Sequence, residues 1–81
     1  MQEIELKLNT PISTNGVTTN ILKIRSPTVG DSLAADSLPE NDLMKEIHLV
    51  ASLCQISTED VKKLALKDYK AIQAAIENFL A

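Results

Sequence analysis

Aromatic residues are scarce in this chain of 81 residues. Tyr69 and Phe79 are its only aromatic side chains, so the core must be built from aliphatic residues. With two aromatics the chain has almost no means of stacking the bases of a nucleic acid. Eight basic and eleven acidic residues give a net charge of −3, opposite in sign to a surface that follows phosphates. The composition therefore disfavours nucleic-acid binding.

Cysteine and long apolar runs are also lacking. Cys54 is the only cysteine, which rules out an intrachain disulfide and a cysteine-based zinc site. No apolar stretch approaches the roughly 20 residues that span a bilayer. The start, Met-Gln-Glu-Ile-Glu, has no basic and apolar signal segment. We expect a soluble, intracellular protein with one domain over residues 1–81, made of a hairpin (1–25) and a helical part (28–81).

The first third of the chain has the alternation of β-strands. Ile4, Leu6 and Leu8 alternate with charged residues up to an interruption at Asn9-Thr10-Pro11. The dipeptide Asn15-Gly16 is a strong hairpin signal, and a β-branched segment follows to Arg25. In that segment Ile21, Leu22 and Ile24 cannot share one face, which predicts either a bulge or a strand that is apolar on both faces.

Capping residues mark the first two predicted helices. Thr28 and Asp31 have the spacing of a capping box for a short helix that ends before Pro39, and Arg25 is placed to pair with Asp31. A second helix is expected to begin near Pro39. Its apolar face is predicted to be one continuous stripe of Leu43, Ile47, Val50 and Cys54.

Two more helices follow. Ser57 and Asp60 again have capping spacing, and Val61 and Leu64 form the apolar side of the third helix. A continuous helix would place the Asp68 carboxylate in an apolar seam, which is costly. We therefore predict a break near Leu66-Lys67, with Asp68 capping the last helix. The resulting fold class is α+β, an N-terminal β-hairpin packed on three to four short α-helices.

No residue constellation points to catalysis, a cofactor or a metal ion. His48 is the only histidine, and Cys54 has no second residue that would activate it as a nucleophile. The pairs Glu3/Glu5 and Glu59/Asp60 fit a solvated strand face and a helix first turn. We expect a protein that is not an enzyme.

Half of the basic residues are gathered in nine positions. This cluster is interpreted as a solvated face, or as a docking patch for an acidic partner. The alternative function is a small regulatory or DNA-associated protein that uses the C-terminal helices. The last helix offers Gln73 and Asn78 but no arginine, which is poor for base recognition. The cluster consists of Lys62, Lys63, Lys67 and Lys70.

Two short motifs resemble a known family, the E-type tail assembly chaperones of contractile-tailed phages and related prophages. They are Leu22-x-Ile24-Arg25-x-Pro27-Thr28-x-Gly30-Asp31 and Leu64-x-x-x-Asp68-Tyr69, the latter leading to Phe79-Leu80. The resemblance implies a non-enzymatic chaperone that binds the phage tape-measure protein in the host cytoplasm and is absent from the mature virion. It also leaves open a longer, frameshifted form of the chain and self-association as a homo-oligomer.

An apolar client helix would be held by side chains at helical spacing. The last helix offers such a row, and the second helix adds a methionine, whose flexible side chain adapts to varied partners. The candidate partner-binding residues are Met44, Tyr69, Ile72, Ile76, Phe79 and Leu80.

Overall fold

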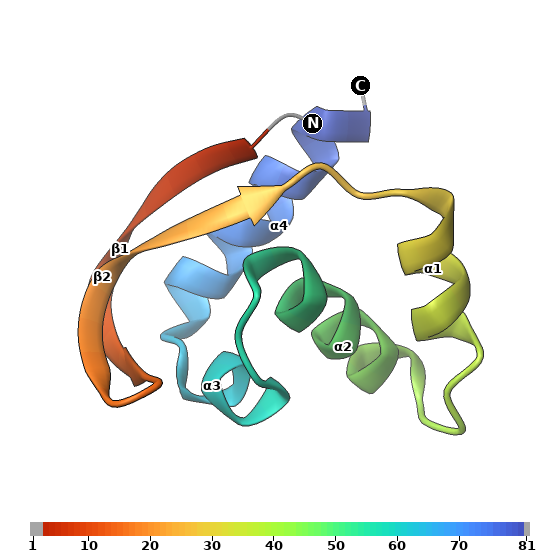
Figure 1. Cartoon of the computed structure of the whole chain (residues 1–81), viewed down its shortest axis with the longest axis horizontal. Helices are drawn as coiled ribbons and strands as arrows, with labels where there is room; N and C mark the ends of the chain where they lie inside the picture. The colour runs from red at the N-terminus through yellow and green to blue at the C-terminus, as the bar shows by residue number, and fades with distance from the viewer. Residues whose placement is uncertain (1–2, 81) are drawn as a thin grey trace.

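Two antiparallel strands followed by four helices make up residues 3–80, the part of the chain that the computed structural model describes (Figure 1). This confirms the predicted α+β class with an N-terminal hairpin. The predicted domain limits at residues 1 and 81 lie outside the described residues. In order, the elements are β1 (Glu3–Thr14), β2 (Val17–Arg25), α1 (Val29–Asp36), α2 (Asp42–Cys54), α3 (Thr58–Lys63) and α4 (Leu66–Leu80).

The hairpin turns where the sequence predicts it. Asn15 and Gly16 both adopt positive φ angles, 53° and 76°, which match the twist of a tight two-residue turn. In β2, Leu22 and Ile24 are buried whereas Ile21 is 46% exposed. This strand therefore has apolar residues on both faces, and the ladder is also irregular between Ile21 and Thr19.

An irregularity of the ladder lies in β1. The pairing passes from Lys7 with Ile21 to Ile12 with Thr19, so several residues of β1 face a single position of β2. The predicted interruption at Asn9-Thr10-Pro11 thus breaks the ladder, although the strand itself continues to Thr14. Leu8 and Ile12, at the two ends of this irregularity, are both buried in the core.

Asp68 does not have the capping role predicted for it. It lies in the first turn of α4, is 1% exposed, and turns its carboxylate toward β1. Oδ1 accepts bonds from the backbone N–H (2.9 Å) and the side-chain amide (3.1 Å) of Asn9, and Oδ2 accepts from the backbone N–H of Thr10 (3.0 Å). The carboxylate lies on the core side of α4 because the irregular part of β1 supplies the donors that an apolar seam would lack. The predicted helix break is real, but it lies at Leu64-Ala65, just before the expected position.

The second helix begins later than predicted. Asn41, not the region of Pro39, is the N-cap, and its side chain accepts from the backbone N–H of Met44 at 2.8 Å. The predicted stripe is buried only in its second half, at Val50 and Cys54, whereas Leu43 is 60% exposed and Ile47 is half-buried. Leu43 and Ile47 border a groove between α2, α3 and α4, which leaves this half of the stripe partly open to solvent.

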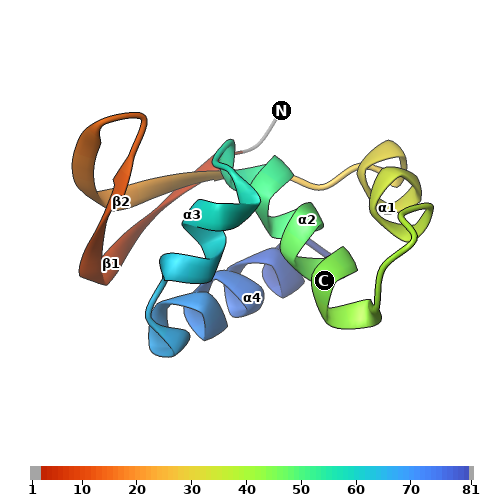
Figure 2. The ribbon, with the colours of Figure 1, turned by 90° about the horizontal axis from the view of Figure 1, so that it is seen from below.

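The core lies between the hairpin and helices α2, α3 and α4. Both strands contribute to it, which satisfies the need of a two-stranded sheet for an apolar support. Helix α1 packs on α2 at the end of the molecule opposite the hairpin loop, as both ribbon views show (Figures 1 and 2). Ala35 is the only residue of α1 that is buried. Helix α1 is therefore a peripheral element that covers little of the core.

Candidate interaction surfaces

The predicted partner-binding residues differ widely in exposure. Ile72 is 0% exposed and belongs to the core, so it offers no surface to a partner in this conformation. Tyr69, Ile76 and Phe79 are half-buried against the core, and Met44 of α2 is half-buried as well. Leu80, at the end of α4, is 71% exposed. The residues predicted on α4 therefore belong mainly to the face that packs on the core, and only Leu80 is largely exposed.

A small groove forms where α2, α3 and α4 meet. Its volume is about 210 Å³, and exposed leucines stand at its edges, Leu43 from α2 (60%) and Leu66 from α4 (69%). It brings together one member of each predicted set, Tyr69 from the partner-binding residues and Lys62 from the lysine cluster. We call it the lysine-rimmed groove; its lining residues are Leu43, Ile47, Val61, Lys62, Leu64, Leu66 and Tyr69.

The four lysines of the cluster are all exposed. Lys62 pairs with Glu59 at 3.1 Å and Lys63 with Asp60 at 3.9 Å, each across one turn of α3. The Lys62–Glu59 pair is exposed on both sides, and an exposed ion pair of this kind adds little stability. The long Lys63–Asp60 distance indicates a weak contact. Lys62 can therefore exchange its partner for the charges of another molecule at little cost.

A larger groove separates α1 from α2. Its volume is about 450 Å³, and its apolar walls include Val29 and Leu33, which are 78% and 66% exposed, together with Leu49. Lys45 reaches Asp36 at 3.6 Å across it. This α1–α2 groove was not predicted from the sequence, because capping residues alone do not show which surface the apolar residues of α1 cover. The signal was the spacing of Val29 and Leu33 at i and i+4 in a helix too short to form a core.

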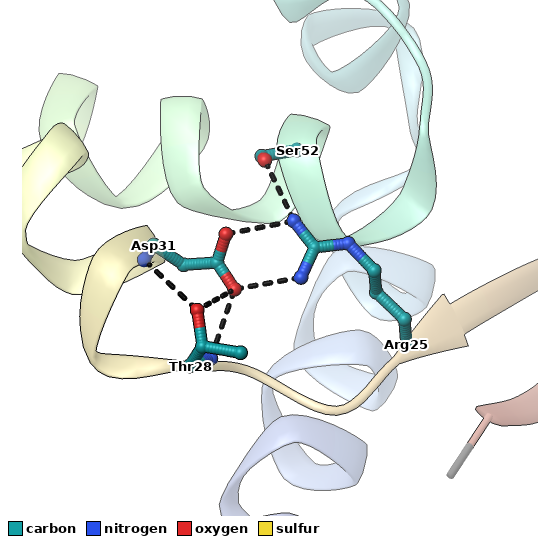
Figure 3. Close-up of polar contacts among 4 residues, drawn as sticks. All are labelled: Arg25, Thr28, Asp31 and Ser52. Carbon is teal, nitrogen blue, oxygen red and sulfur yellow. Dashed lines mark hydrogen bonds and ion pairs between the residues drawn. The ribbon is translucent and has the colours of Figure 1, made fainter. Parts of the chain in front are cut away.

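A polar network fixes the start of α1 to the rest of the fold (Figure 3). The Arg25 guanidinium donates two bonds to the Asp31 carboxylate, at 2.6 and 2.7 Å, and a third to the Ser52 hydroxyl of α2 at 3.1 Å. Thr28 and Asp31 also form the predicted capping box. The Arg25 hydrogen bonds, with help from Thr28, hold the pKa of Asp31 well below its ordinary value. The predicted pairing of Arg25 with Asp31 is thus confirmed as a contact.

The cysteine, tyrosine and histidine considered in the sequence are wholly or partly buried, or paired with a neighbouring side chain. Cys54 is buried, and this burial raises the pKa of its thiol to about 11. Burial, reinforced by the Glu46 carboxylate, raises the pKa of Tyr69 to about 12. His48 faces Glu40 at 3.1 Å near the surface. Among residues 3–80 no three acidic, histidine or cysteine side chains gather as a metal site requires.

The helices of residues 3–80 include none long and apolar enough to cross a membrane. Apolar grooves lie on two flanks of α2 in this part of the chain, one beside α1 and the lysine-rimmed groove beside α3 and α4. Such exposed apolar surface is typical of proteins that bind other proteins.

One protein family matches nearly the whole chain. The family described as phage tail assembly chaperone proteins, E, or 41 or 14, matches the chain over residues 5–81. No curated protein and no solved structure gives a significant match. The family match covers both strands and all four helices apart from the first residues of β1. The chain therefore belongs to the family of phage tail assembly chaperones.

Proposed function

We propose that this tail assembly chaperone acts without catalysis and binds the phage tape-measure protein through the apolar grooves that flank α2. The observation that carries the proposal is that large apolar side chains remain exposed around these grooves: Val29, Leu33, Leu43 and Leu66. In a domain of 81 residues, apolar area that stays in water adds nothing to the stability of the fold. A client helix that covers the grooves would bury this area, which favours binding.

The grooves suit helical clients for a geometric reason. Helices present apolar side chains at i, i+3, i+4 and i+7, and a groove between helices accepts such a row. Leu33 and Leu43 stand beside different grooves on the two flanks of α2, so one long client or two client segments could be held together. Met44, half-buried on α2, and Leu80, exposed at the end of α4, remain further candidate contacts.

The test is co-expression with the tape-measure protein of the same gene cluster, followed by measurement of the client in the supernatant and by affinity capture. We expect the chaperone to keep the client in the supernatant and to be captured with it. Leu33→Ser and Leu66→Ser should each weaken capture roughly tenfold, because each removes apolar area from the contact. Val17→Ser is the matched control, since Val17 is 62% exposed but lies at the hairpin turn. A client that aggregates equally with and without the chaperone would refute the proposal.

The family resemblance supplies the rest of the proposal. The chain acts in the cytoplasm of the bacterial host and leaves before the virion is complete. A longer, frameshifted form of the chain and a homo-oligomer are further proposed partners. Mass spectrometry of infected cells and of purified virions tests these points: the chaperone should be found in the former and be absent from the latter.

A further inference from the structure

The lysine-rimmed groove has the size of a site for protein side chains. At about 210 Å³ it is smaller than the roughly 300–1,000 Å³ of pockets that bind small molecules. Its floor is apolar, and exposed Leu43 and Leu66 stand on either side. A hydrophobic residue from a partner helix can be buried there between the two leucines.

Basic residues are concentrated beside this groove, where Glu59 and Asp60 pair with Lys62 and Lys63. Four of the eight basic residues occupy positions 62–70, and the one acidic residue in that stretch, Asp68, is buried and bonded to β1. Lys62 lines the groove, and Lys70 follows Leu66 by one turn on the same side of α4. Lys62 and Lys70 can therefore attract carboxylates of a partner that occupies the apolar floor.

Two lysines of α4 have no charge partner in the described fold. Lys67 lies in the first turn, at the positive end of the helix dipole, where carboxylates are favoured and cations are not, and Lys70 lies in the second turn. Neither forms an ion pair among the described residues. Both are therefore available to a negatively charged partner.

From this arrangement we propose that the lysine-rimmed groove receives an amphipathic helix whose apolar stripe is flanked by Asp and Glu residues. The inference deepens the proposed function, on which it rests for taking that helix to be part of the client. The apolar side chains enter between Leu43 and Leu66. The carboxylates pair with Lys62, which lines the groove, and with Lys70, which lies one turn after Leu66 on α4. Nucleic acid would use the lysines but gains nothing from an apolar floor, and the net charge of −3 opposes it.

Two designed peptides test this directly. Both are helices of about five turns with the same leucine stripe, one flanked by glutamate and the other by lysine. We expect the glutamate peptide to bind the full chain at least about tenfold more tightly at low salt. The difference should shrink at high salt, because screening weakens exposed charges, while the apolar contact remains.

Variants identify the site. Leu66→Ser should weaken both peptides, Lys62→Gln with Lys70→Gln should abolish the preference between them, and Val17→Ser should change neither. Four results would overturn the inference: equal binding of the two peptides, no binding of either, an unchanged preference in the lysine variant, or displacement of the peptide by duplex DNA.

The same measurements separate this inference from the proposed function. If the wild-type chain retains the tape-measure protein but does not distinguish the peptides, only this inference fails. If it distinguishes the peptides but does not retain the client, the proposed function fails instead.

Discussion

Asp68 connects two segments that lie 59 residues apart in the chain. Its carboxylate accepts three hydrogen bonds from Asn9 and Thr10, and the two backbone donors lower its pKa. The bonds from the two backbone N–H groups occupy donors that the irregular ladder of β1 leaves free. One side chain thus fixes the position of α4 against the hairpin.

Removal of this carboxylate should be severely destabilising. Asp68→Ala leaves the backbone donors of Asn9 and Thr10 unpaired beside the core, so we expect the melting temperature to fall by roughly 10 °C or more. Asp36→Asn is the control, because the Asp36 side chain is 86% exposed, and it should change the melting temperature by only a few degrees. Thermal unfolding followed by circular dichroism measures both. Equal effects of the two substitutions would contradict the role given to Asp68.

The second residue-scale prediction concerns Arg25 and Asp31. Their side chains are 20% and 13% exposed and meet in a two-bond geometry, so the pair should be worth more than an ordinary surface ion pair. A double-mutant cycle with Arg25→Met and Asp31→Asn, measured by urea unfolding, should give a coupling free energy of about 1 kcal/mol. A coupling of zero would mean that the contact does not stabilise the attachment of α1.

At the scale of elements, the end of α2 has a strained residue. Gln55 follows the helix with φ of 57°, and the N–H of Ile56 donates to the carbonyl of Ala51, as in a helix C-cap that usually carries glycine. Gln55→Gly should therefore raise the free energy of unfolding by roughly 0.5–1 kcal/mol. Gln55→Ala keeps the strain and should give no such gain. Urea unfolding of the two variants decides between them, and a loss of stability in the glycine variant would contradict the explanation.

Features set by neighbouring residues were predictable from the sequence. The Asn15-Gly16 turn and the capping boxes at Thr28/Asp31 and Ser57/Asp60 all lie where their spacing indicates. Each depends on a few adjacent residues, and the chemistry of the turn or cap is local. The late start of α2 was missed because Asn41 is a better N-cap than any residue near Pro39.

Features that depend on distant contacts were not predictable. The sequence pattern treats the Asp68 carboxylate as unsuited to an apolar seam, since the donors from Asn9 and Thr10 become available only when β1 folds against α4. For the same reason the periodicity of α2 could not show that Leu43 stays exposed, or that Leu66 stands opposite it across a groove. Periodicity identifies an apolar face, but not which part of that face the rest of the chain covers.

At the scale of the whole molecule, three aspartates tie the hairpin and helices together and make stability depend on pH. Hydrogen bonds lower the pKa of Asp31 (from Arg25), Asp60 (from Thr14) and Asp68 (from Asn9). A pKa lowered by folding means that the stabilisation is fully present above the unfolded pKa of about 3.9 and is lost as the pH falls below it. The urea midpoint should be similar at pH 7 and 5.5 and should decrease steeply toward about pH 3. Asp31→Asn should make that decrease shallower, and a midpoint that does not change with pH would contradict this account.

We propose that this chaperone holds its client against the flanks of α2. Hydrogen–deuterium exchange of the chaperone, alone and in complex with the tape-measure protein, would show which segments the client covers. We expect slower exchange in α1, in the N-terminal half of α2 and in the first turns of α4, because a bound helix would stabilise these segments. The hairpin turn should change little. Protection confined to the hairpin, or no change anywhere in the chain, would contradict the proposal.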